Sequence, residues 1–356
     1  MLSSRYALRL HRHIGRGAPP WNTRTKMTFV SILLALIAEQ FRALGRNNPI
    51  HEIVRALGDR AEHAFDTGRP RDAALAWFTV VLPLTLAVVV VHYLLASISV
   101  ALTLAWNVLV LYMTLGFRQF SHYFTDIHEA LNRDDVHTAR TLLHEWTGLD
   151  TVEMPVTEIV RHTLEAAIIA VHRHVFGVFF WFLVPVGPGG VVLYRVAEYL
   201  GRHWNEPSTE RSPALGRFAA HAFYLLDWIP SRLTAIGFAI VGNFEDAVYA
   251  WRNHARKWND AVNGILLASG GGALGVRLGT PLAEDDSTVV LRASVVGPAV
   301  DYAPGMEEDN GPEPSAPEFG AEPGVRTLQS AVGLVWRAVV LWMLLLAMVS
   351  LALWVG

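Results

Sequence analysis

The sequence predicts an all-α fold, a polytopic integral membrane bundle with amphipathic, cytoplasmic helical inserts. Hydrophobic residues make up 52% of the 356 residues and charged residues only 17%, whereas soluble domains carry about 25% charged residues. Long apolar runs, such as 74–117 and 328–355, exceed the ~20 residues that a membrane span needs. Polar segments with helical periodicity lie between such runs. We therefore expect one membrane bundle with polar inserts rather than two soluble domains.

The composition also excludes several classes of site. The chain has no cysteine, which rules out disulfides, thiolate zinc sites, iron–sulfur clusters and cysteine nucleophiles. Its net charge is −3, so the chain carries no electrostatic signature of nucleic-acid binding. The expected partner is therefore the lipid bilayer, with no nucleic acid.

The N-terminal residues 1–26 hold six basic residues and no acid. We expect a disordered basic extension, which is either a juxtamembrane tail or a stretch upstream of a natural start at Met27. The apolar run from Thr28 to Ala38 is short for a span and is expected to be non-spanning or re-entrant. Residues 27–299 are then predicted to form the membrane domain.

The next two segments contrast in polarity. Residues 42–73 carry mixed charges on an amphipathic pattern, which indicates a solvated helix. The apolar tract 74–117 is about twice the length of a single span. It therefore predicts a tight helical hairpin with limbs at 75–96 and 100–117.

Residues 118–174 form the predicted polar insert, a soluble helical pair that lies against the membrane. Its first four histidines follow one another at gaps of six, nine and seven residues, at His122, His128, His137 and His144. These gaps fail the i, i+4 spacing that places two imidazoles on one helix face. We therefore predict no metal site.

Proline and glycine interrupt the apolar segment 175–194, at Pro185 and at 187–190. This cluster lacks any phosphate-binding pattern and predicts a break between two half-helices. Tyr194 closes the segment, and Arg195 and Glu198 follow it.

The C-terminal part contains three further segments. Residues 246–263 combine aromatic and basic side chains, which is typical of an interfacial anchor. Residues 300–324 are acidic and rich in proline and glycine, so they predict a flexible loop. Residues 325–356 contain a final transmembrane helix.

The apolar stretch 223–247 carries unusual residues for a membrane segment. A charge inside an apolar run is unfavourable, so Asp227 and Arg232 either pair, lie at the water interface or face a polar cavity. Pro230 removes a backbone donor and predicts a kinked or half-embedded element. The alternative is an interfacial helix start, with Trp228 in the aromatic belt and Arg232 extended toward water.

Three strings carry a resemblance to a known family. Residues 226–234 read LDWIPSRLT, residues 272–279 read GALGVRLG, and residues 148–151 read GLDT. Together they resemble the CobD/CbiB family of cobalamin-pathway membrane proteins, and the first string is similar to its AmpE-like branch. The resemblance implies a multi-pass protein of the bacterial inner membrane.

The chain departs from this family where the family's chemistry is expected. Glu165 matches the first residue of a family string of the form E-S-x-A-E-N-x-x-D-G. However, Ile169 and Ala170 replace its Glu-Asn pair, and Arg173 replaces its aspartate. A site built on carboxylates and an amide cannot work through isoleucine and alanine. The departure therefore disfavours catalysis.

The resemblance leaves three functions open. The first is a non-catalytic, AmpE-like protein of cell-envelope sensing and signalling, which acts through a membrane or envelope protein partner and needs no cofactor. The alternative is an adenosylcobinamide-phosphate synthase, which ligates an aminopropanol unit to cobyric acid and needs Mg²⁺ and a corrinoid. The third is a transporter, suggested by broken helices and intramembrane charges.

The candidate site residues follow from these functions. The candidates for ligand binding are Asp227, Arg232, Arg277 and Tyr194. No residue is expected to be catalytic under the first function, and Glu165 is the catalytic candidate under the second.

Overall fold

A computed structural model describes residues 20–41, 49–184, 187–206, 211–258, 260–279 and 320–355. The elements in chain order are α2 (Pro20–Phe41), α3 (Pro49–Phe65), α4 (Pro70–Ile98), α5 (Val100–Thr114), α6 (Phe117–Asn132), α7 (Val136–Thr147), α8 (Val156–Val171), the π-helical turn η1 (His172–Phe176), α9 (Gly177–Leu183), α10 (Pro188–His203), α11 (Pro213–Val241), α12 (Phe244–His254), the 3₁₀ turn η2 (Ala255–Lys257), α13 (Ala261–Leu274) and α14 (Val325–Val355).

The all-α membrane fold is confirmed. Four helical segments are long and apolar enough to cross a membrane, namely Pro70–Ile98, Val156–Leu183, Pro213–Val241 and Val325–Ala352. The described residues contain no strand, and their one extended pairing is a parallel bridge between Val276 and Ala321. Helices suit a bilayer because each satisfies its own backbone hydrogen bonds without water.

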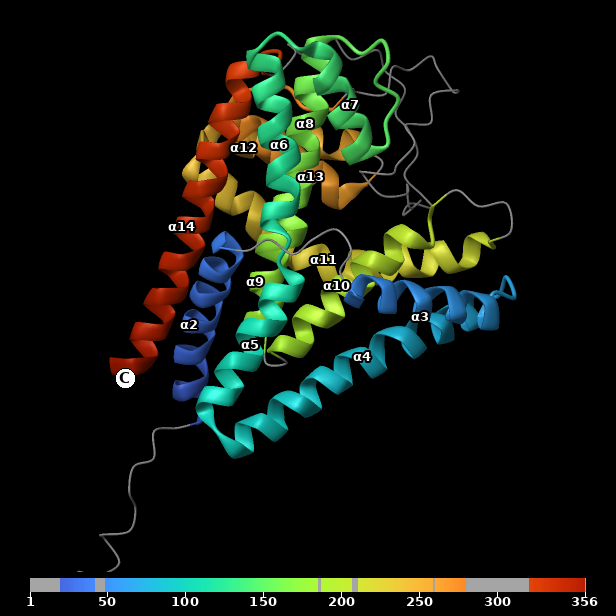
Figure 1. The fold of residues 1–356 in the computed structure, drawn as a ribbon. Coiled ribbons are helices and arrows are strands. Elements are labelled where there is room, and N and C mark those ends of the chain that lie inside the picture. Colours follow the sequence, from blue (N-terminus) through green and yellow to red (C-terminus); the bar gives the residue numbers. More distant parts are fainter. Residues whose placement is uncertain are drawn as a thin grey trace, which may run out of the picture.

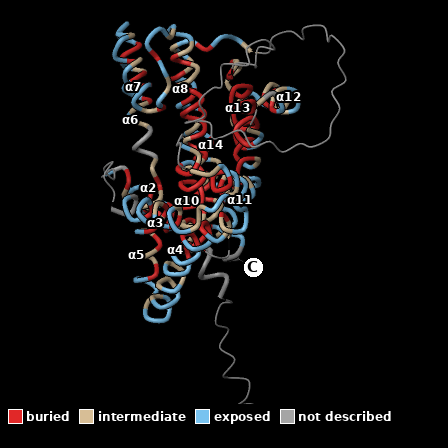
Figure 2. Tube along the Cα trace, turned by 90° about the vertical axis from the view of Figure 1, so that its right-hand side faces the viewer, coloured by how far each residue is buried: buried red, intermediate tan, exposed pale blue. Residues whose placement is uncertain are grey.

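The helices form a column with an arm. In Figure 1, α2 lies between α14 and α5, and α6 continues the column above α5, while α4 runs obliquely away from the start of α5 beneath α3. Helices α10 and α11 pack on each other and on α4, and α13 packs on α11 and α12. Figure 2 shows the buried residues concentrated along α8, α13 and the centre of the bundle, whereas the outer faces are exposed. Polar groups in this central region therefore need partners within the protein.

The apolar tract 74–117 folds as two helices joined at one residue. Helix α4 ends at Ile98 and α5 begins at Val100, with Ser99 between them in an extended conformation. The Ser99 hydroxyl accepts a hydrogen bond from the Ala101 amide at 3.2 Å and so caps α5. These two helices correspond to the limbs of the expected hairpin.

Helix α11 contains the stretch in which Pro230 predicts a kinked or half-embedded element. It is one helix of 29 residues that continues through Pro230, and it is long enough to span a membrane. A proline inside a helix leaves the carbonyl four residues earlier without its donor. Here the carbonyl of Leu226 accepts a hydrogen bond from Nε1 of Trp181 on α9, at 3.2 Å. A neighbouring helix thus supplies the missing bond.

Other boundaries also differ from expectation. Helix α2 begins at Pro20, inside the extension expected to carry no fold, while residues 1–19 lie outside the described part. The polar insert ends before Val156, because α8 is apolar and largely buried. The break between half-helices falls between Leu183 and Pro188, where Gly187 adopts a positive φ of 59°.

Most of the expected acidic loop, up to residue 319, lies outside the described residues. Its end is paired: Arg277 N donates to the carbonyl of Ala321 at 2.9 Å, and Ala321 N donates to the carbonyl of Gly275 at 3.1 Å. Ala321 is therefore held against the turn that follows α13.

Candidate functional site

A buried polar group lies where η1, α10 and α11 meet. Asp227 is 1% exposed, and its Oδ1 lies 2.8 Å from Nε2 of His172. The hydroxyl of Tyr194 donates to the same oxygen at 2.9 Å. On its other side, Nδ1 of His172 lies 2.9 Å from Oγ1 of Thr234. The group joins residues far apart in sequence and holds a carboxylate in the interior.

The local backbone explains how His172 reaches this group. Helix α8 passes into the π-helical turn His172–Phe176 before α9 continues. A π turn inserts one residue into a helix and rotates the side chains that follow, and such turns are frequent at functional sites. It places His172 inward with 0% exposure and Arg173 next to α10 and α13.

The expected pairing of Asp227 with Arg232 is wrong. Five residues along a helix correspond to a rotation of about 140° at 3.6 residues per turn, so the two side chains point to different sides. The guanidinium of Arg232 lies 3.9 Å from the ring centroid of Trp228, and its Nη1 donates to the Trp228 carbonyl at 2.7 Å. Trp228 is 44% exposed, so this contact fits the alternative of an interfacial pair.

A charged group, which we call the arginine cluster, consists of Arg173, Arg195, Glu198 and Asn263. Nη1 of Arg195 lies 3.1 Å from Oε2 of Glu198, and Nη1 of Arg173 lies 4.0 Å from Oε1. Nη2 of Arg173 donates to Oδ1 of Asn263 at 3.5 Å. The arginine cluster joins η1, α10 and α13. It lies next to the Asp227 group, because Arg195 of the cluster directly follows Tyr194, which contacts Asp227.

The electrostatics of the arginine cluster keep Glu198 ionised. Burial alone would raise the pKa of Glu198, but the guanidinium groups of Arg195, Arg202 and Arg173 outweigh burial and hold it at about 2. Two atoms of this region are buried without a hydrogen-bond partner among the described residues, Oδ2 of Asp227 and Nε of Arg173. The site thus offers one unused acceptor and one unused donor, which is what a polar ligand requires.

Glu165, the catalytic candidate, belongs to a separate contact. It precedes His172 by seven residues, or about 10 Å along the helix axis. Its Oε1 accepts a hydrogen bond from the Gly279 amide at 2.5 Å, and its Oε2 lies 3.0 Å from Nδ1 of His162. Glu165 therefore anchors the end of the GALGVRLG string to α8.

Arg277 lies in that string, two residues before Gly279. The string forms a tight turn after α13, because Gly275 and Gly279 have φ of 70° and 78°. A Cβ on Gly279 would overlap the ring of Trp258. Of the four ligand-binding candidates, the structure therefore brings together Asp227 and Tyr194, and it places Arg232 and Arg277 in other contacts.

Sequence reasoning missed His172, Asn263 and the role of Glu198. Arg195 and Glu198 have the i, i+3 spacing of a helical ion pair, which is a signal that was available. No local signal marks His172 as the partner of Asp227, because 55 residues separate them. Asn263, 90 residues from Arg173, is 0% exposed inside the cluster.

The central site does not fit a resident Mg²⁺ ion. Magnesium requires about six oxygen ligands in octahedral geometry. Both carboxylate oxygens of Glu198 instead face guanidinium groups, Oε2 that of Arg195 and Oε1 that of Arg173, so neither oxygen is left for a cation. The oxygens of Asp260 accept hydrogen bonds from Val262, at 2.9 Å, and from Asn263. No step of the chemistry is therefore assigned to a metal bound here.

Comparison with known proteins gives the family. The profile described as CobD/Cbib protein matches residues 32–291. The chain is 30% identical over 328 residues to "Cobalamin biosynthesis protein CobD" of Stutzerimonas stutzeri, covering 89% of this chain and 96% of that protein. It is 34% identical over 172 residues to the protein of the same name from Chromobacterium violaceum, covering 48% of this chain and 54% of that relative.

A third relative represents the other branch. "Protein AmpE" of Shigella flexneri is 25% identical over 232 residues, covering 63% of this chain and 78% of that protein. No solved structure matches the chain significantly.

These relatives overturn the first expected function. The relatives at 30–34% identity carry the name of a cobalamin biosynthesis protein, whereas the AmpE relative is less similar. The expectation of a non-catalytic, AmpE-like signalling role is therefore wrong. The strings at 226–234 and 272–279, the membrane helices and the matched profile agree: this chain belongs to the CobD/CbiB family.

Proposed function

We propose that this chain is a multi-pass protein of the bacterial inner membrane that acts in cobalamin biosynthesis. Its reaction is that of an adenosylcobinamide-phosphate synthase, which forms an amide between a carboxylate of cobyric acid and the amine of an aminopropanol unit. The observation that carries this proposal is the Stutzerimonas stutzeri relative, which is named for cobalamin biosynthesis and is similar over 96% of its length.

The chemistry of amide formation matches the groups of the central site. MgATP first converts the carboxylate into a mixed anhydride with phosphate. The amine nitrogen then attacks the acyl carbon, phosphate leaves with the electron pair of the broken C–O bond, and the nitrogen loses a proton, so the site needs a proton acceptor. Asp227 offers its unpartnered Oδ2, while His172 and Tyr194 hold its other oxygen. We assign Asp227 and His172 to this proton transfer.

The reaction also needs donors that bind negative charge, on the carboxylate and on phosphate groups. Arg173 keeps a buried, unpartnered Nε, and the guanidinium of Arg195 lies beside it through their shared contact with Glu198. Guanidinium groups suit carboxylates and phosphates because they present several donors in a plane. We assign Arg173 and Arg195 to binding the anionic parts of the substrates. Under this proposal, Mg²⁺ enters the site bound to ATP. The corrinoid is a substrate of the reaction and not a resident cofactor.

The proposal is tested by a corrinoid assay on membranes that contain the full chain. The membranes receive adenosylcobyric acid, aminopropanol or its phosphate, and MgATP, and the products are separated by mass. We expect the amidated corrinoid. Absence of product beside an active relative assayed in parallel would refute the assignment.

Two variants on the same helix locate the chemistry. Asp227→Asn removes the proton acceptor with little change in volume, and we expect the rate of amide formation to fall about 100-fold or more, in the range of lost acid–base catalysis. Arg232→Gln is the matched control, because Arg232 faces Trp228 instead, and its rate should stay within about threefold of the parent. Equal rates for the parent and Asp227→Asn would remove Asp227 from the mechanism.

A further inference from the structure

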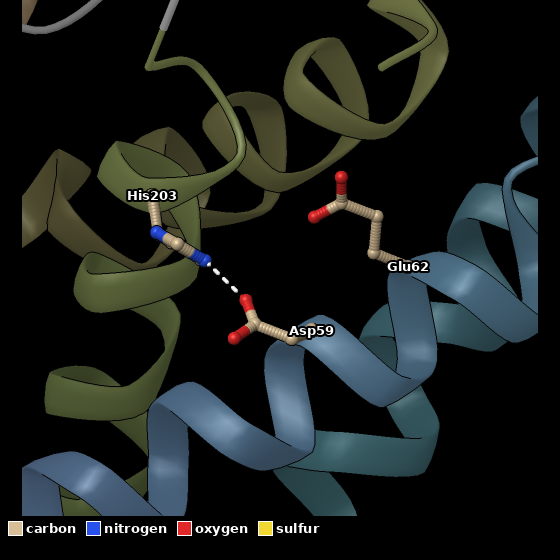
Figure 3. A group of neighbouring side chains, drawn as sticks. All are labelled: Asp59, Glu62 and His203. Carbon is tan, nitrogen blue, oxygen red and sulfur yellow. Dashed lines mark hydrogen bonds and ion pairs between the residues drawn. The ribbon is translucent and has the colours of Figure 1, made fainter. Parts of the chain in front are cut away.

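A second group of chemically active side chains lies away from the central site, between α3 and the end of α10. Figure 3 shows Asp59 and Glu62 on one turn of α3 with His203 of α10 facing them. One ligand atom from each of the three residues lies within 4.8 Å of the others. Within the described residues, this is the one group of histidine and carboxylate side chains arranged to hold a metal ion.

Both ring nitrogens of His203 face carboxylates. Nε2 of His203 lies 2.8 Å from Oδ1 of Asp59, and Nδ1 lies 3.3 Å from Oε2 of Glu206. An imidazole that binds a metal ion through one nitrogen keeps an N–H on the other, which donates to a neighbouring carboxylate. The two contacts therefore suit a cation held between Nε2 and Asp59, with Glu206 on the far nitrogen.

Neighbouring groups orient the side chains in the way that outer residues orient metal ligands. Glu206 faces the ring nitrogen opposite Asp59, as in the carboxylate–histidine–metal arrangement. Nε of Arg211 donates to Oε1 of Glu62 at 2.8 Å, which leaves Oε2 available. The ring of Tyr199 stacks on His203 at 5.3 Å between centroids. The imidazole and one carboxylate are therefore held in place before any ion binds.

We propose that Asp59, Glu62 and His203 bind one first-row divalent cation of the Zn²⁺ type, with water as the fourth ligand. A mixed set of one imidazole nitrogen and two carboxylate oxygens suits Zn²⁺. Magnesium and calcium prefer ligand sets made of oxygen alone. The ion clamps α3 to α10 across 144 residues of sequence, so the site is structural and independent of the proposed enzymatic reaction.

The test uses the full-length protein purified in detergent and treated with EDTA. Titration calorimetry with ZnCl₂ should show one strong site per chain, and MgCl₂ at the same concentration should give no binding heat. At a hundredfold excess of Zn²⁺ over Kd, the melting temperature should rise by about 5 °C.

Variants separate this site from other zinc-binding surfaces. Asp59→Asn should abolish the strong site, and Glu206→Gln should raise Kd about 10–100-fold, as expected for a residue that orients a ligand. His137→Gln is the control, because His137 is exposed on α7, and it should bind like the parent.

Two results would overturn the proposal. Equal Zn²⁺ binding by the parent and by Asp59→Asn would show adventitious binding elsewhere. Absence of a strong site in the parent would show that the group is a hydrogen-bonded contact between helices only.

Discussion

Two histidine–aspartate pairs in this molecule share the same contact and differ in their surroundings. His172 and Asp227 lie 2.8 Å apart with side-chain exposures of 0% and 1%. His203 and Asp59 also lie 2.8 Å apart, but their exposures are 10% and 44%. The first pair is enclosed by η1, α10 and α11, whereas the second lies at the edge of the α3–α10 contact (Figure 3).

The difference shows that burial, rather than distance, determines what such a pair does. In the interior, water cannot replace a lost partner, so each polar atom depends on the protein. At the edge, water competes for Asp59, and the pair by itself contributes little to stability. The buried pair can therefore support chemistry, because protein groups hold the carboxylate of Asp227 in one position. The exposed pair contributes more to stability only if an ion binds to it.

The largest expected effect is the loss of the buried carboxylate. Asp227→Ala leaves His172 and the hydroxyl of Tyr194 without their shared acceptor. Removing one partner of a buried pair costs about 3–5 kcal/mol of unfolding free energy. The measurement is a thermal or denaturant midpoint of the protein in detergent.

Asp126→Ala provides the control for that measurement, because Asp126 is exposed on α6. It should shift the unfolding free energy by less than about 0.5 kcal/mol. If Asp227→Ala were no less stable than this control, the buried pair of His172 and Asp227 would not stabilise the fold. The proposed difference between the buried and the exposed pair would then be refuted.

A somewhat smaller effect concerns pH and the arginine cluster. The pKa of Glu198 is about 2 in the folded protein against an ordinary value of 4.5. A depressed carboxyl pKa contributes stability above the unfolded value, and this contribution is lost as pH falls from 4.5 toward 2. The full contribution is on the order of 3 kcal/mol.

The check is to compare the parent with Glu198→Gln between pH 7 and pH 3. The parent should lose more stability across this window than the variant. In the unfolded parent Glu198 gains a proton as the pH falls, whereas in the folded parent it stays ionised, and the variant has no such group. Parallel pH profiles for the two proteins would mean that the arginines do not hold Glu198 ionised.

The smallest effect is expected at the exposed pair without metal. In EDTA, Asp59→Asn should lower the unfolding free energy by about 0–1 kcal/mol, as for an exposed ion pair. With saturating Zn²⁺, the difference between parent and variant should increase, since only the parent binds the ion strongly. A loss of several kcal/mol in EDTA would instead show that the pair behaves like the buried one.

Local rules predicted the helices but not their partners. The apolar runs 74–117 and 328–355 became α4, α5 and α14, because apolar length and helical hydrogen bonding act within one segment. The break before Pro188 was also predictable, since proline and glycine act on their own backbone. These features need no knowledge of neighbouring elements.

The sequence by itself therefore determined the all-α membrane class, most helix positions and the family strings. The tertiary structure decided the site. Pairing with the nearby Arg232 was one of three environments that the sequence left open for Asp227, yet helix geometry turns it toward His172 and Tyr194, which are 55 and 33 residues away. Asp59 and His203 meet across 144 residues in the same way. Side-chain identity is local, whereas the partners of a buried charge depend on how whole helices pack.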